Sequence, residues 1–68
     1  MNTIKITTEF IKLDSLLKFS GLVETGGIAK AVIQNELVKV NNTICIQRGK
    51  KIRVGDIIEF DGKVLNII

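Results

Sequence analysis

The spacing of apolar residues changes at Glu36, and this change limits the folds that the chain can adopt. Before Glu36 the apolar residues recur at intervals of three and four, which is typical of amphipathic helices. After it, Val38 and Val40 are separated by Lys39, which is the period-2 pattern of a half-buried strand. Helices in one part of the chain and strands in another indicate an α+β fold.

Two helices are predicted in the first half of the chain. Thr8 is a suitable N-cap for the first, and Gly21 a suitable C-cap, because glycine adopts the left-handed conformation without strain. Its apolar face consists of Phe10, Leu13, Leu16 and Leu17. Thr25 caps the second helix and Gly26-Gly27 form its first turn; its buried face consists of Ile28, Ala29, Val32 and Ile33. A connection of about four residues places the two helices side by side as a helical hairpin.

Short strands are predicted on both sides of the helices. Thr3–Ile6 precedes them. After the helices, Asn41-Asn42 tolerate the positive φ of a tight hairpin turn, so a second strand returns through Ile44 and Ile46.

The remaining strands lie near the C-terminal end of the sequence. Gln47–Arg53 is predicted to be a polar, basic connection around Gly49. Asp61-Gly62 is a strong hairpin signal between the strands Ile57–Phe60 and Lys63–Ile68. The predicted order is strand, helix, helix and four short antiparallel strands, in a single domain spanning residues 1–68.

Few residues are available for chemistry. The chain has no histidine and one cysteine, Cys45, so it can form neither an intramolecular disulfide nor a zinc site of the usual ligands. Asp56 and Asp61 occupy turn positions, and Glu59 alternates with buried strand residues. We therefore expect no enzymatic activity and no cofactor, and we expect Cys45 to be a small apolar residue of the fold.

The longest uncharged stretch, Val40–Gln47, is far too short to cross a bilayer. Residues 1–6 contain one lysine and no apolar segment of the kind found in signal peptides. We expect a cytoplasmic protein that does not contact a membrane.

Positive charge is concentrated in one segment. Between Leu37 and Gly55 all charged residues are basic: Lys39, Arg48, Lys50, Lys51 and Arg53. The rest of the chain carries five basic and seven acidic residues. A fixed group of cations gains affinity for nucleic acid by releasing counterions from phosphates. The three aromatic residues leave little for stacking on unpaired bases, so we expect binding to the backbone of structured RNA.

Gly26-Gly27 has two interpretations. Free N–H groups at a helix start favour an anion, and glycines let a phosphate come close. The same glycines could instead let the two helices pack closely. The sequence leaves both open.

The residues together resemble the S4-type RNA-binding domain, or alpha-L motif, in the form of a short, free-standing bacterial member. The resemblance spans residues 10–60 and rests on Lys12-Leu13-Asp14, Leu17, Thr25 to Lys30, Ile33, Val38 to Asn41 and Val54 to Ile58. It implies a helical hairpin packed on a small, bent antiparallel sheet of four to five short strands. It also implies binding to double-stranded or junction RNA, often ribosomal RNA.

The resemblance also implies roles for single residues. Lys12 stands where the family usually has arginine, Lys30 where its second helix is basic, and Asn41 in its Val-Asn-Gly turn, with Asn42 replacing the glycine. Thr25-Gly26 replaces the Ser-Arg pair that usually opens the second helix, and the Arg48 to Lys51 stretch takes over part of that role.

The RNA-binding residues predicted are Lys12, Thr25, Gly26, Gly27, Lys30, Lys39, Asn41, Arg48, Lys50, Lys51 and Arg53. The expected partner is ribosomal RNA or tRNA, or the ribosome, bound by a monomer. The alternative is a protein-interaction adaptor of the same fold that uses an edge strand or a helix face.

Overall fold

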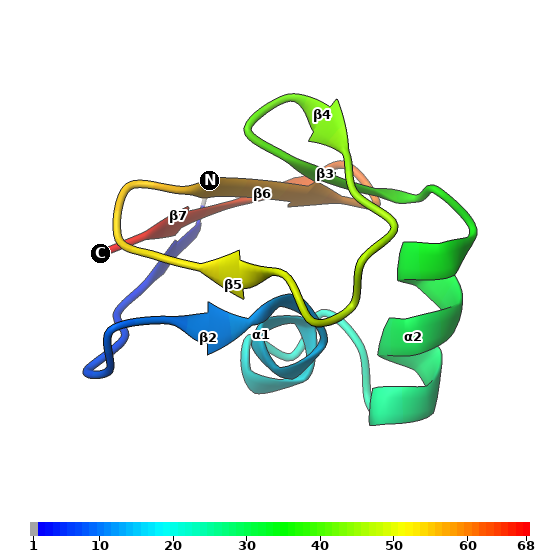
Figure 1. Cartoon of the computed structure of the whole chain (residues 1–68), viewed down its shortest axis with the longest axis horizontal. Helices are drawn as coiled ribbons and strands as arrows, with labels where there is room; N and C mark the ends of the chain where they lie inside the picture. The colour runs from blue at the N-terminus through cyan, green and yellow to red at the C-terminus, as the bar shows by residue number, and fades with distance from the viewer. Residues whose placement is uncertain (1) are drawn as a thin grey trace.

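The computed structural model describes residues 2–68 (Figure 1). Met1 lies outside them, so the expectations about a signal peptide in residues 1–6 and a domain of residues 1–68 extend beyond the part described. The helices are α1 (Leu13–Phe19) and α2 (Gly26–Gln34). The strands are β1 (Asn2–Ile4), β2 (Ile11–Lys12), β3 (Val38–Val40), β4 (Thr43–Ile44), β5 (Lys51–Ile52), β6 (Ile57–Phe60) and β7 (Lys63–Ile67). Over residues 2–68, neither helix has the length and apolar character of a membrane span.

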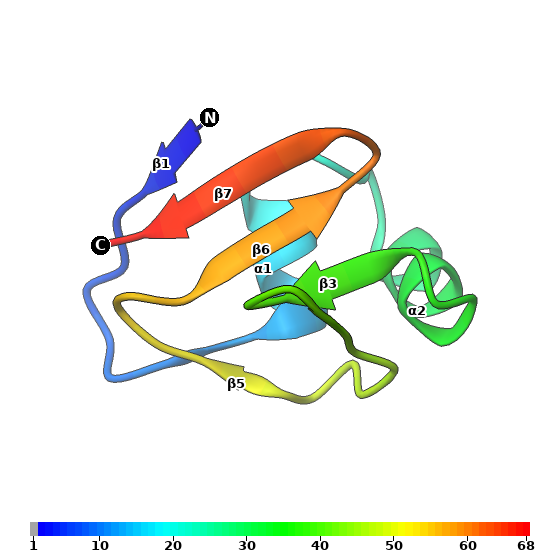
Figure 2. The same cartoon turned by 90° about the horizontal axis from the view of Figure 1, so that it is seen from above.

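The larger sheet has the strand order β1-β7-β6-β3-β4. Figure 2 looks onto this sheet, with α1 behind it and α2 beside β3. The predicted α+β class is confirmed, but the prediction that all strands are antiparallel is wrong, because β1 pairs with β7 in parallel, with Asn2 opposite Leu65. This pairing joins distant parts of the chain, whereas turn residues predict only pairings between neighbouring strands.

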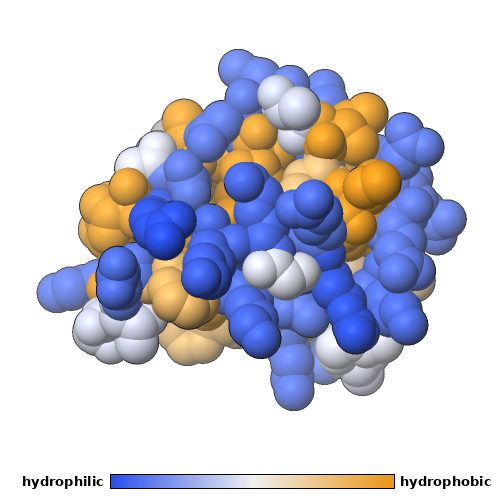
Figure 3. All heavy atoms as spheres, in the orientation of Figure 1, coloured by the Kyte–Doolittle hydropathy of each residue, from blue (hydrophilic) through white to orange (hydrophobic). Residues whose placement is uncertain are grey.

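A second, two-stranded sheet corrects two predictions. Ile11 and Lys12 pair with Ile52 and Lys51, so β5 replaces part of the predicted connection Gln47–Arg53. The same pairing keeps residues 11–12 extended, so α1 begins at Leu13 rather than after Thr8. Long-range pairing has overridden the helical spacing of the sequence. Figure 3 shows hydrophilic atoms over much of the face that contains β2 and β5.

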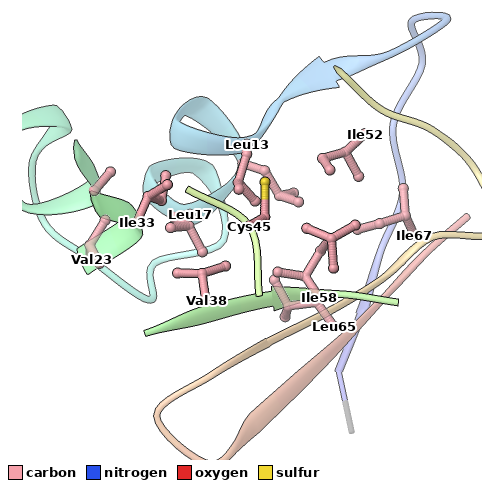
Figure 4. Packing of buried hydrophobic residues seen from close by; sticks show 13 residues of the cluster. Leu13, Leu17, Val23, Ile33, Val38, Cys45, Ile52, Ile58, Leu65 and Ile67 are labelled. Carbon is pink, nitrogen blue, oxygen red and sulfur yellow. The ribbon is translucent and has the colours of Figure 1, made fainter. Parts of the chain in front are cut away.

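The core lies between the larger sheet and the helices (Figure 4). Its buried residues are Leu13, Leu16, Leu17, Val23, Ala29, Ile33, Val38, Val40, Cys45, Ile52, Ile58, Leu65 and Ile67. The predicted face of α2 is only partly correct: Ala29 and Ile33 are buried and Val32 is half-buried, but Ile28 is 44% exposed. The predicted strand through Ile44 and Ile46 ends at Ile44, because Cys45 then turns into the core.

The predicted turns are confirmed by backbone conformation. Asn41 and Asn42 have φ values of 52° and 69°, and Asp61 and Gly62 have values of 53° and 74°. Two consecutive residues with positive φ match the twist of a two-residue hairpin. Asn41 also joins two strands through its side chain: Oδ1 accepts from the Ile57 N–H at 2.9 Å, and Nδ2 donates to Asp56 Oδ1 at 3.0 Å.

The C-terminus of α2 has an unusual residue in a common motif. The Leu37 N–H donates to the Val32 carbonyl at 3.1 Å, and the Glu36 N–H donates to the Ile33 carbonyl at 3.2 Å. These are the two hydrogen bonds of a Schellman motif, in which the residue at the position of Glu36 is left-handed and usually glycine. Glu36 adopts a φ of 62° despite its Cβ.

We predict that Glu36→Gly stabilises the fold by about 0.5–1 kcal/mol, because it relieves the left-handed strain and removes a negative charge from a helix C-terminus. Chemical denaturation measures the change. Glu36→Gln is the control, since it removes the charge and keeps the Cβ; an equal gain in both variants would show that φ is not the cause.

Asn41→Gly should destabilise the fold by about 1–2 kcal/mol, because glycine keeps the positive φ but loses both side-chain hydrogen bonds. Asn42→Gly is the matched control and should be neutral or slightly stabilising. Thermal melts of the two variants test this, and similar melting temperatures would contradict a bridging role for Asn41.

Candidate nucleic-acid interface

The backbone of the basic segment is attached to the start of α1. Lys12, at the N-cap, makes no side-chain capping hydrogen bond. Instead, the Leu13 N–H donates to the Lys50 carbonyl at 2.9 Å, and the Asp14 N–H donates to the Arg48 carbonyl at 3.0 Å. The first N–H groups of a helix lack partners within the helix, and here the basic segment provides two. Residues 48–52 are therefore held by a helix and a strand.

The end of the segment is fixed by two side chains. The Arg53 N–H donates to Asp56 Oδ2 at 2.9 Å, and the other oxygen of Asp56 accepts from Asn41. The side-chain amide of Asn41 thus bonds to protein groups on both sides. These hydrogen bonds show that Asn41 stabilises the turn beside the basic segment.

Two cations face each other across the small sheet. Lys12 and Lys51 are direct partners in the antiparallel register, and both are exposed. Like charges at opposed positions destabilise a strand pair. Lys12 also stands at the positive end of the dipole of α1, where a cation is unfavourable. A bound anion would relieve both effects.

Within residues 2–68, Lys12, Lys51 and Arg53 form no ion pair with an acidic side chain. Two acidic side chains of the region accept from backbone N–H groups: Asp14 Oδ1 from the Ser15 N–H at 2.7 Å, and Asp56 Oδ2 from the Arg53 N–H at 2.9 Å.

The structure brings five of the predicted residues into one region around β2, β5 and the turn before β5. They are Lys12, Arg48, Lys50, Lys51 and Arg53, and we call them the cation face. Hydrophilic atoms dominate this region in Figure 3, with apolar atoms next to it toward β4. All five residues are exposed.

The predicted residues of α2 form a separate group. The Thr25 hydroxyl accepts from the Ile28 N–H at 3.1 Å, which confirms its role as the N-cap. A Cβ at Gly26 would meet no atom within 4 Å, and one at Gly27 would meet only Thr25 Oγ1, at 3.8 Å. Close helix packing therefore does not explain the two glycines. Lys30 is exposed on the same helix.

Lys39 lies away from the cation face. Val38 and Val40 are buried beneath the larger sheet, so Lys39, between them, lies on its outer side. There it is opposite Glu59 in the register of β3 and β6. It also borders a shallow depression lined by Glu36, Glu59 and Asp61.

Phe10 is a functional candidate that the sequence did not reveal, and its assignment to a buried helix face is wrong. It precedes β2, and its half-buried ring lies 4.9 Å from Lys51 Nζ and 6.0 Å from Arg53 Cζ. The alternation Lys51-Ile52-Arg53 was the available signal, because it is typical of a strand with both cations on one side.

Comparison with known proteins agrees with this architecture. The S4 domain family model matches residues 4–68. The Bacillus subtilis (strain 168) protein named "Probable ribosome maturation protein RlbA" is 39% identical over 61 residues, which cover 90% of this chain and 86% of that protein. The solution structure of YbcJ from E. coli, described as revealing an alfaL motif involved in RNA-binding, matches with a TM-score of 0.77 and 29% identity, over 100% of this chain and 87% of that one. The chain therefore belongs to the S4 domain family.

Proposed function

We propose that this protein binds structured RNA through the cation face and performs no catalysis. The observation that supports this most is the pairing of Lys12 with Lys51 on a backbone that is fixed by hydrogen bonds. An arrangement that is unfavourable for the free protein is favourable once a phosphate lies between the two ammonium groups.

The geometry favours a folded RNA over a flexible single strand. Cations held at fixed spacings suit the regular phosphates of a helix or junction, and each contact adds affinity by counterion release. Proteins that bind single strands stack bases on exposed aromatic rings. Here the ring of Phe10 already contacts Lys51 and Arg53, and the exposed ring of Phe19 lies at the opposite end of α1 from Lys12, outside the cation face.

The relatives support a more specific partner. RlbA is named for ribosome maturation and YbcJ is described by an RNA-binding motif. We therefore propose ribosomal RNA, on the ribosome or on its precursors, as the partner, with tRNA as the second choice. The protein acts in the cytoplasm as a monomer under this proposal.

A second candidate function, protein adaptor, has one observation in its favour. β4 lies at the edge of the larger sheet; Ile44, its last residue, is 46% exposed, and Ile46, just after it, is 60% exposed. They line a groove of about 430 Å³ that also includes Lys50. Exposed apolar side chains are typical anchors for proteins, so the groove is the place to test this alternative.

Replacing Arg48, Lys50, Lys51 and Arg53 by alanine should strongly weaken binding to a stem–loop RNA. The slope of log affinity against log salt should become shallower by up to about four, at roughly one per phosphate contact. Fluorescence anisotropy at several salt concentrations measures both quantities.

The control for this variant replaces Lys5, Lys18, Lys39 and Lys63, which changes the net charge equally. It should keep most of the slope. If both variants lose affinity alike, affinity depends only on net charge, and the proposal that RNA binds at the cation face is wrong. A loss confined to Ile44→Ser/Ile46→Ser, tested beside them, would favour the groove.

Gly27→Ala tests whether RNA also reaches the start of α2. The variant should be more stable by about 0.5–1 kcal/mol, because alanine favours a helix and its Cβ has room. RNA affinity should fall, since the Cβ blocks close approach of a phosphate to the backbone. Ala31→Gly, on the exposed side of α2, is the control that alters only stability. Unchanged affinity in a more stable Gly27→Ala protein would show that RNA does not contact this helix start.

A further inference from the structure

The half-buried ring of Phe10 lies within 6.0 Å of two cations. The partly buried apolar residues that pack against the core are Ile4, Ile6, Ile11, Leu22, Val32 and Phe60. Phe10 is not among them, although it immediately precedes Ile11. Its backbone is fixed nearby, because the Thr8 hydroxyl donates to the Phe10 carbonyl at 2.8 Å.

The register explains how one ring reaches two cations. Ile11 is opposite Ile52 and Lys12 is opposite Lys51, and extending the pairing by one residue places Phe10 opposite Arg53. Alternate residues of a strand lie on the same side, so Phe10, Lys12, Lys51 and Arg53 share one side of the small sheet. Ile11 and Ile52 lie on the other, toward the core.

The ring restricts where the side chains of these cations can lie. A cation within about 6 Å of the centre of an aromatic ring is attracted to its negative face. Without the ring, Lys12, Lys51 and Arg53 repel each other, and their long side chains are free to move apart into solvent. With it, the Lys51 ammonium group lies 4.9 Å from the ring centre, on a residue whose backbone is paired with that of Lys12.

We propose that Phe10 is a positioning residue that holds Lys51 and Arg53 in place for one RNA phosphate, which binds between them and Lys12. This inference rests on the proposed RNA-binding function. Phe10 itself does not contact the phosphate. Removing its ring should therefore lower affinity and leave the number of ionic contacts unchanged.

The test compares Phe10→Leu, which is apolar without a π face, with Phe10→Trp, which has the strongest one. Phe10→Leu should bind a stem–loop RNA about three- to tenfold more weakly, with an unchanged salt slope, and Phe10→Trp should retain full affinity. In the background Lys51→Ala/Arg53→Ala, Phe10→Leu should have no further effect. Circular dichroism confirms that each variant is folded, and Phe10→Met provides a second variant without a π face.

An NMR measurement on the protein without RNA tests the contact between Phe10 and Lys51 independently of the proposed RNA binding. In the free protein, the ring current of Phe10 should shift the Lys51 Hε NMR signals upfield, and Phe10→Leu should remove the shift. Normal RNA binding by folded Phe10→Leu and Phe10→Met would overturn the inference, as would an equal loss in the Lys51→Ala/Arg53→Ala background. If the unaltered protein shows the ring-current shift but binds no RNA, the proposed function has failed and the phosphate-positioning role fails with it.

Discussion

The Leu13 and Asp14 amides donate to the Lys50 and Arg48 carbonyls, and the arrangement of the molecule depends on this junction. It completes the start of α1, which has no side-chain cap. It also brings residues 11–12 beside residues 51–52, so that the small sheet forms where the helical half of the chain meets the strand half. The backbone of residues 48–52 is thereby fixed to α1 and β2, and its basic side chains extend from fixed positions.

The same junction links stability to the proposed binding. Ile11 and Ile52 on one side of the small sheet contribute to or pack against the core, while Lys12 and Lys51 on the other side face each other in solvent. Burial of the apolar pair stabilises the pairing that brings the two charges together. The core thus maintains an unfavourable charge arrangement, which an RNA phosphate relieves under the proposed function.

Local chemistry made part of this structure predictable. Thr25 and the Asn41-Asn42 and Asp61-Gly62 turns act within a few residues, so their roles followed from the sequence. The two-residue strands β2 and β5 did not, because the alternation Lys51-Ile52-Arg53 is too short to identify a strand by itself and each strand exists only by pairing with the other. The parallel pairing of β1 with β7 was missed because it joins distant parts of the chain, whereas turn residues predict only pairings between neighbouring strands. At the site, charge segregation indicated Arg48 to Arg53. The register was needed to show that Lys12 is opposite Lys51, and the side-chain positions to show that Phe10 contacts two cations.

The most direct test of this account is a titration of the isotope-labelled protein with a stem–loop RNA, followed by the NMR shifts of its backbone amides. The account predicts that the largest changes occur at Lys12 and at residues 48–53, with the amides of Leu13 and Asp14 remaining protected from hydrogen exchange throughout. Changes confined to β4 and Ile46, or to the outer side of the larger sheet around Lys39, with residues 48–53 unaffected, would contradict it.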